Sequence, residues 1–236
     1  MNKLLTLTAS MLIVFVTSNI ANAASINIGV QAGVATLNAS GSETSSVNTG
    51  AETSVTTASV ENASIPIAAV FAEYESDFYG LTLGVSHIPM TADVSDSVKN
   101  RTDVETSVTG DVTTNTGSRA FKANAEVENF NTVYVELPVA GGFFVRAGMS
   151  QIDVNTLEVA SSNGGNYGNK TLDGTTLGAG LKGDFANGMG YKLFYEQTDF
   201  DTLKLTSSGN SVSGESNSLT ADLDVTELKF ALSYKF

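Results

Sequence analysis

The sequence predicts an all-β protein, an eight-stranded antiparallel up-and-down β-barrel that crosses a membrane with its strands. Three observations lead to this fold class. Apolar and polar residues alternate with a period of two along eight separate segments, as in strands whose two faces meet different surroundings. The connections between these segments alternate between short turns and long polar stretches. Aromatic residues collect beside the short turns.

The N-terminal segment is expected to be a secretory signal peptide rather than part of the fold. Lys3 supplies a positive charge, an apolar stretch follows that is densest at residues 11–16, and Ala21-Asn22-Ala23 has the small residues of a cleavage site. The apolar stretch is shorter than the roughly 20 residues that a membrane-spanning helix needs. We therefore divide the chain into a signal peptide, residues 1–23, and a barrel domain, residues 24–236.

The C-terminal strand shows the alternation most clearly. Its apolar face consists of Leu228, Phe230, Leu232, Tyr234 and Phe236. The residues between them, from Glu227 to Lys235, are all small or charged. Seven earlier segments repeat this pattern, around residues 28–34, 70–74, 79–86, 132–137, 143–150, 177–182 and 191–196. Each has room for the roughly 9–11 residues with which a tilted strand crosses a bilayer.

The connections alternate in length. Three are tight turns, at residues 75–77, 139–142 and 186–188, and they contain residues that turns favour. Four long polar segments lie between them, at residues 38–64, 89–125, 157–173 and 206–219. This layout is typical of a transmembrane barrel with short periplasmic turns and long extracellular loops. Because valines recur at intervals in the first two long segments, we expect these segments to extend the strands partway as hairpins.

Aromatic residues near the short turns and the C-terminus are expected to form one ring at the periplasmic interface, where amphipathic rings prefer to lie. The ring consists of Tyr74, Phe78, Tyr79, Phe143, Phe185, Tyr191, Tyr234 and Phe236.

The polar face of each strand must point into a closed cylinder, because hydrocarbon does not tolerate open strand edges. That face carries five acidic and five basic residues, which predict a charge network in the lumen: Glu73, Glu136, Arg146, Lys182, Asp184, Lys192, Glu196, Glu227, Lys229 and Lys235. An eight-stranded barrel is just wide enough for side chains to fill, and unpaired charges inside it would be costly. We therefore expect a salt-bridged, side-chain-filled interior.

The composition excludes several classes of protein. Cysteine is absent, which removes disulfides, thiolate zinc sites and thiol nucleophiles, and the single His removes a multi-histidine metal site. A net charge of -13 argues against nucleic acid as a partner. We expect no cofactor, no metal and no enzymatic activity.

With these features the chain resembles the small eight-stranded outer-membrane barrels of Gram-negative bacteria, the OmpX-like and OmpA-transmembrane-like class. The resemblance rests on the Ala-Asn-Ala cleavage site and on the alternating final strand that ends in Phe236. It implies that the apolar face of this strand is the C-terminal assembly signal: Leu228, Phe230, Leu232, Tyr234 and Phe236. It also implies a monomer in the outer membrane, delivered by periplasmic chaperones to the outer-membrane assembly machinery and surrounded by outer-membrane lipid and lipopolysaccharide.

Three functions are compatible with this barrel. The first is a structural or surface-interaction role, adhesion-type, through polar acidic extracellular loops. The alternative is a narrow channel for small or hydrophobic solutes, as in OmpW-like relatives, which inward-facing glycines would favour: Gly29, Gly33, Gly80, Gly84, Gly148, Gly178 and Gly180. The third is an outer-membrane lipid-modifying enzyme that uses Ser86 and His87. Neighbouring residues on a strand point to opposite faces, so these two form a poor nucleophile–base pair.

Overall fold

The computed structural model describes residues 25–47, 53–94, 99–109, 112–123, 125–157, 159–160, 166–208 and 215–236. The predicted signal peptide lies outside the described residues, and so do parts of the long segments. In the described part of the chain, no helix is long and apolar enough to cross a membrane.

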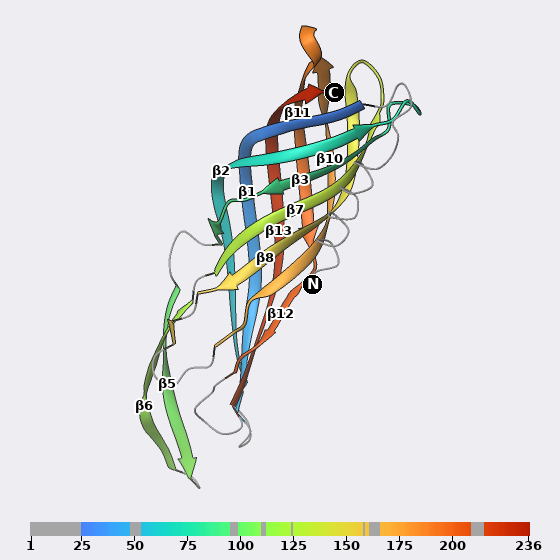
Figure 1. Cartoon of the computed structure of the whole chain (residues 1–236). Coiled ribbons are helices and arrows are strands. Elements are labelled where there is room, and N and C mark those ends of the chain that lie inside the picture. Colours follow the sequence, from blue (N-terminus) through green and yellow to red (C-terminus); the bar gives the residue numbers. More distant parts are fainter. Residues whose placement is uncertain are drawn as a thin grey trace.

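Eight antiparallel strands close into a barrel, which confirms the predicted fold class (Figure 1). In order around the ring they are β1 (Ser25–Val47), β2 (Thr53–Glu75), β3 (Thr82–Ile88), β7 (Ala125–Pro138), β8 (Phe143–Thr156), β10 (Lys170–Asp184), β11 (Met189–Phe200) and β13 (Glu215–Lys235). The ring closes where β1 pairs with β13, from Asn27 opposite Lys235 to Val47 opposite Glu215. Closure satisfies the backbone groups that an edge strand would leave open to lipid.

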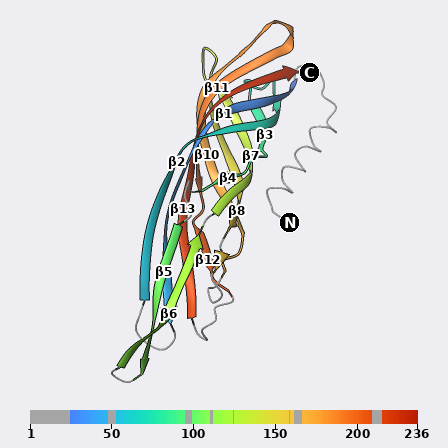
Figure 2. The same cartoon turned by 90° about the vertical axis from the view of Figure 1, so that its left-hand side faces the viewer.

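Shorter strands lie at the end of the molecule away from the short turns (Figures 1 and 2). The strand β4 (Ala92–Asp93) follows β3 and pairs with β7, while β12 (Leu203–Thr206) follows β11 and pairs with β13. The strands β5 (Lys99–Thr109) and β6 (Val112–Ala123) form a hairpin, and β9 (Val159–Ala160) pairs with β6.

Two of the three short turns occupy the predicted residues. Residues 139–142 join β7 to β8, and the 3-10 turn η1 (Ala186–Gly188) lies between β10 and β11. The first turn is longer than predicted, because β3 begins at Thr82 rather than at Tyr79. Tyr79 and Gly80 have positive φ values of 54° and 66°, which a strand does not contain, and the amide of Ser76 donates to the carbonyl of Leu81 at 2.8 Å to close the turn.

The first long segment extends the barrel wall as a hairpin. Beyond a register shift between Ala35 and Leu37, β1 and β2 pair from Leu37 opposite Asn62 to Ser46 opposite Thr53. On its other side, the same part of β1 pairs with β13. Three strands therefore continue together well past the last large apolar residue on the outward face of β1, Val34.

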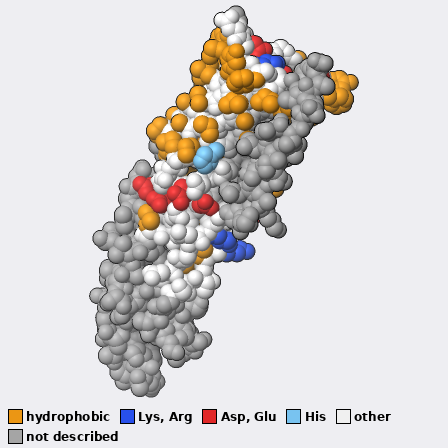
Figure 3. Space-filling view, in the orientation of Figure 1, with side chains coloured by type: hydrophobic (Ala, Val, Ile, Leu, Met, Phe, Trp, Pro, Cys, Tyr) orange, Lys and Arg blue, Asp and Glu red, His pale blue; other side chains and the backbone are white. Residues whose placement is uncertain are grey.

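Along each long strand the two faces exchange character at about the same level. On β13 the outward residues change from Leu228 to Thr226 and Asp224, while the inward residues change from Glu227 to Val225. Figure 3 shows the result on one face of the molecule, with hydrophobic side chains over the end that carries the short turns and polar ones beyond them. The half of the barrel that carries the short turns therefore suits lipid outside and polar groups inside. The other half is built as a water-soluble barrel around an apolar core.

We call this apolar interior the outer core. Its buried members come from all eight barrel strands and from β12: Ala35, Leu37, Ala69, Ile88, Val127, Phe130, Ile152, Val154, Leu172, Phe200, Leu203, Leu223 and Val225. The rings of Phe130 and Phe200 meet edge to face, with centroids 5.6 Å apart.

At the opposite end, aromatic side chains cluster around the short turns. Three pairs stack with centroid distances of 4.7 to 5.0 Å: Phe78 with Tyr79, Phe185 with Tyr191, and Tyr234 with Phe236. Tyr191 is half-buried and the other five are exposed, a placement that suits a membrane interface.

Candidate functional site

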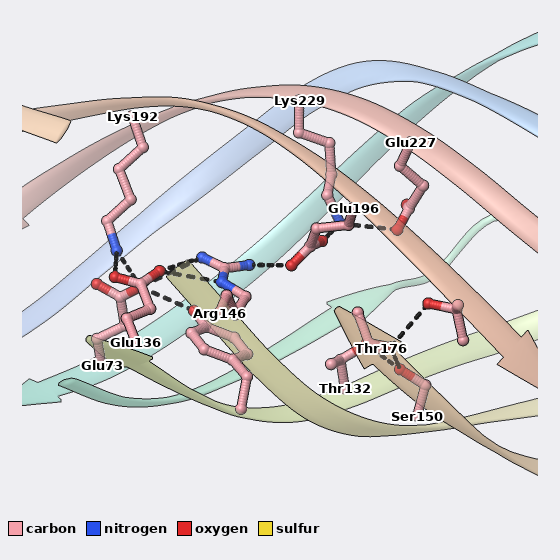
Figure 4. Close-up of polar contacts among 12 residues, drawn as sticks. Glu73, Thr132, Glu136, Arg146, Ser150, Thr176, Lys192, Glu196, Glu227 and Lys229 are labelled. Carbon is pink, nitrogen blue, oxygen red and sulfur yellow. Dashed lines mark hydrogen bonds and ion pairs between the residues drawn. The ribbon is translucent and has the colours of Figure 1, made fainter. Parts of the chain in front are cut away.

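The barrel interior holds one connected network of charged side chains (Figure 4). Its seven ionisable members come from five strands and are each at most 6% exposed: Glu73, Glu136, Arg146, Lys192, Glu196, Glu227 and Lys229. All seven belong to the lumen set that strand parity predicts. We call them the lumen network.

Arg146 is the centre of the lumen network. Its Nη1 donates to Glu196 Oε1 at 2.7 Å and its Nε donates to Glu136 Oε1 at 3.0 Å, while Nη2 also contacts Glu136. The guanidinium carbon lies 3.8 Å from the ring centroid of Tyr134 and 4.3 Å from that of Phe194. A planar cation between two rings and two carboxylates is held on every side, so this side chain blocks the bore.

Two lysines complete the network on either side of Arg146. Lys192 Nζ lies 2.5 Å from Glu73 Oε1 and 2.7 Å from Glu136 Oε2. Lys229 Nζ lies 2.5 Å from Glu196 Oε2 and 3.0 Å from Glu227 Oε2. The chain of contacts therefore runs across the bore from Lys192 to Glu227.

Three predicted members of the lumen set lie outside this network. Lys182 Nζ is 3.9 Å from Glu136 Oε2 and 22% exposed, so it contacts the network only at its edge. Lys235, 46% exposed, pairs with Glu75 at 3.6 Å, and Asp184 is exposed. All three lie at strand ends beside the short turns, where water reaches them. Sequence reasoning missed Glu75 because it assigned this residue to a turn, whereas it ends β2.

Next to the lumen network, away from the short turns, lies a row of buried hydroxyls. Thr132, Ser150, Thr176 and Thr198, one each from β7, β8, β10 and β11, are joined by contacts of 2.8, 2.5 and 2.7 Å. Each hydroxyl both donates and accepts, so such a row satisfies its own polar groups without water. It separates the lumen network from the outer core.

Three of the predicted inward-facing glycines do not open the bore, because aromatic side chains from neighbouring strands occupy the space beside them. A Cβ atom on Gly84 would lie 2.3 Å from the Tyr134 ring, and one on Gly29 would lie 2.6 Å from the Phe71 ring. A Cβ on Gly180 would meet a side-chain carbon of β11 at 2.4 Å. Gly80, predicted to face inward on a strand, lies in the first turn. At these levels the glycines make room for large side chains of neighbouring strands, and they do not leave a channel.

Ser86 and His87 do not form a catalytic pair. Ser86 is buried inside the barrel, whereas His87 Nδ1 contacts the Oδ1 atom of Asn131 at 2.8 Å across the β3–β7 pair. An amide can orient an imidazole, but it is neither a nucleophile nor a base. Within the described ranges, no group of three or more His, Asp or Glu side chains is arranged to hold a metal ion.

A pocket lies on the far side of Glu227, in the wall of the outer core. Its cavity volume is about 50 Å³, and it is open on one side to the surroundings of the barrel. The walls are apolar and come mainly from β1, β2, β3 and β7, and the polar side chains among them belong to Glu128 and Glu227. We call this the outer pocket. The sequence did not indicate it, because its lining comes from segments that we expected to be loops or strand ends.

No family model matches the chain, and no curated protein matches it. Solved structures with similar folds include Neisserial surface protein A, which is 12% identical, with a TM-score of 0.37 over 91% of this chain and 100% of that one. OprG from Pseudomonas aeruginosa is 12% identical, with a TM-score of 0.45 over 89% and 95% of the two chains. Ail of Yersinia pestis is 10% identical, with a TM-score of 0.37 over 89% and 99%. These similarities concern the barrel fold alone.

Proposed function

We propose that the protein is a non-conducting barrel of the Gram-negative outer membrane, which presents an acidic, strand-built structure at the cell surface for adhesion-type interactions. The observation that carries this proposal is the continuation of β1, β2 and β13 beyond the apolar outward face. Paired strands hold their distal end at a fixed height above the lipid, whereas an unpaired loop would not. A stiff projection is suited to contact with another surface.

The barrel interior supports a role without conduction. Arg146, the rings against it and the row of hydroxyls fill the bore at successive levels. An eight-stranded barrel leaves no space around such side chains for a continuous water path. Purified protein in a planar bilayer is therefore expected to give no steady current steps, and steady steps would overturn this part of the proposal.

The charge around the base of the projection supports a basic or cation-coated partner. Just beyond the apolar outward face, exposed carboxylates lie on neighbouring strands and their connections: Asp173, Asp199, Asp201 and Asp222. Asp199 lies directly opposite Asp224 in the β11–β13 pair. Like charges opposite each other weaken a sheet, so the protein keeps this acidic surface at some cost in stability.

The test separates the projection from the barrel. Because Gly41 lies opposite Ala58, replacing residues 42–57 with Asn-Gly should close a shorter β1–β2 hairpin at a favourable two-residue turn. We expect the shortened protein to reach the outer membrane and to keep a heat-dependent gel mobility. Attachment of cells that express it to a basic surface should fall to the level of cells that lack the protein.

A charge variant is the matched control for the length of the projection. Asp173→Asn together with Asp222→Asn keeps every strand and removes two exposed charges. We expect this variant to weaken attachment in part and to flatten its dependence on salt. Undiminished attachment by the shortened protein would show that the projection is not the interacting part.

A second candidate function, passage of small hydrophobic solutes, is favoured by the outer pocket. Uptake of a radiolabelled uncharged solute into intact cells would test it. Uptake that is independent of the protein would remove this candidate and leave the surface role untouched.

A further inference from the structure

We propose that the outer pocket is a binding site for a single-chain amphiphile with a hydrocarbon tail and a primary ammonium head, and that the ammonium group contacts Glu227. This site is separate from the surface role proposed above. It rests on the lining of the pocket, on the strand pairing beside it and on the charge at its inner end.

The lining suits a hydrocarbon chain. Ile65 and Ile67 of β2 line the pocket together with Ile88 and Phe130, and Leu37 and Val225 complete the apolar wall. Replacing water at such a surface by hydrocarbon is favourable, because apolar area is removed from water.

The wall of the pocket contains a seam between two strands. β2 pairs with β3 only from Val70 opposite His87 to Glu75 opposite Thr82. Farther out, β2 has no strand partner on this side in the described part of the chain. Instead, the amide of Ala68 donates to the sulfur of Met90 at 3.2 Å, a weak contact to a flexible side chain. A hydrocarbon chain can therefore reach the pocket here without breaking a backbone ladder.

The seam begins at the outer edge of the lipid-facing surface. Val70 is exposed on the outward face, and the outward face of β2 continues with Ala68 and Pro66. Proline has no amide hydrogen to contribute to a ladder, which suits its place on this open side. An amphiphile dissolved in the outer leaflet thus has a short path to the site.

The inner end of the pocket is suited to a positively charged hydrogen-bond donor. Glu227 is 1% exposed, and Lys229 contacts its Oε2 at 3.0 Å. Its other oxygen, Oε1, is buried and has no hydrogen-bond partner among the described residues. The lumen network has four carboxylates and three cations, and Glu227 is the carboxylate at its outer end. A primary ammonium supplies the missing donor and places a second positive charge beside this carboxylate.

The same charges disfavour other head groups. A fatty acid would bring its carboxylate towards Glu227 and towards Glu128, which also lines the pocket and accepts a hydrogen bond from Asn155 Nδ2 at 2.9 Å. An alcohol would offer a donor without a charge. The order of affinity should therefore be amine, alcohol, carboxylate for tails of equal length.

The isoleucines of this chain allow ligand binding in the outer pocket to be measured directly. Four of the six after residue 24 line the pocket, Ile65, Ile67, Ile88 and Ile152, while Ile26 and Ile28 lie at the other end of β1. The experiment uses protein with labelled isoleucine methyl groups in phosphatidylcholine nanodiscs, titrated with n-decylamine, n-decanol or decanoate. We expect saturable shifts at the four pocket methyl groups with decylamine and no saturable shift at the other two. Equal changes at all six would show partition into lipid and would overturn the proposal.

Two variants separate the head contact from the tail contact. Glu227→Gln should weaken decylamine binding about tenfold and leave decanol binding unchanged. Ala92→Leu, which narrows the pocket without altering charge, should weaken both ligands. Glu75→Gln, a carboxylate at the short-turn end, is the matched control and should change neither. Unchanged decylamine affinity in Glu227→Gln would overturn the assignment of the head group, even if that variant loses some stability. None of these three variants should alter cell attachment, which keeps this test independent of the surface role.

Discussion

Arg146→Met offers the sharpest test of how the lumen network stabilises the barrel. The substitution preserves much of the side-chain volume and removes the charge, the hydrogen bonds to Glu136 and Glu196, and the contacts with two aromatic rings. Four buried carboxylates then share Lys192 and Lys229. Water does not reach this level of the bore to solvate the uncompensated charge.

The expected loss is large. Removing one partner of a buried ion pair costs about 3–5 kcal/mol, and contacts between a desolvated cation and an aromatic face add about 1–2 kcal/mol. We expect Arg146→Met to lower the free energy of unfolding by about 4–6 kcal/mol, a large part of the roughly 5–15 kcal/mol of an ordinary domain. Arg146→Lys keeps the charge but cannot reach both carboxylates, so its loss should be about 1.5–3 kcal/mol.

Urea unfolding in lipid vesicles measures these losses. The chain has no Trp, so far-ultraviolet circular dichroism and heat-dependent gel mobility would report the transition. Lys235→Met is the control, because the Lys235–Glu75 pair is partly exposed and should contribute about 0–1 kcal/mol. In the double variant Arg146→Met with Glu136→Gln, part of the loss should be recovered, since one uncompensated carboxylate is removed. A loss in Arg146→Met no larger than in Lys235→Met would refute the reasoning.

Two further predictions concern packing and assembly. Gly84→Ala should cost about 1–3 kcal/mol, because the new Cβ would press on the Tyr134 ring, against which Arg146 also packs. Gly168→Ala, where a Cβ meets nothing within 4 Å, should change the free energy of unfolding by less than about 0.5 kcal/mol, and equal losses in both variants would contradict the packing argument. Phe236→Ala should leave unfolding in detergent nearly unchanged, because the ring is 72% exposed, yet reduce several-fold the fraction of chains assembled in the outer membrane. An undiminished assembled fraction on heat-modifiability gels would argue against an assembly signal.

The parts of the fold that the sequence predicts are those that the bilayer dictates. A strand in lipid must alternate, so parity alone separates Arg146 and Lys192 from Val145 and Leu193. The bore is narrow, and charged side chains of the same face therefore meet. Parity does not say which carboxylate pairs with which cation. That depends on strand tilt and register, which bring Glu73 of β2 to Lys192 of β11 across the barrel.

Local alternation also misleads at one turn. Tyr79 and Gly80 continue the apolar–small pattern of β3, so the sequence predicts strand there. Their positive φ values place both residues in the turn. Tyrosine is an uncommon residue in this conformation, and a pattern search has no reason to expect it.

The outer core escaped prediction for a different reason. The period of two persists beyond the membrane, but the apolar residues move to the other face, as from Leu228 to Val225 on β13. A search that follows only an apolar outward face ends each strand at this exchange. The residues beyond it are then interpreted as a loop. Following the inward residues past Glu227 to Leu223 would have indicated a buried core within the long segments.

This exchange of faces also fixes the depth of the barrel in the membrane. On β8 the outward face changes from Met149 to Gln151 where the inward face changes from Ser150 to Ile152. On β1, across the ring, the outward face changes after Val34, and the inward face becomes apolar by Leu37. A barrel displaced outward would expose apolar surface to water, and one displaced inward would bring outward carboxylates into hydrocarbon. Both displacements are unfavourable, so the outer pocket is held at the level where lipid ends and water begins.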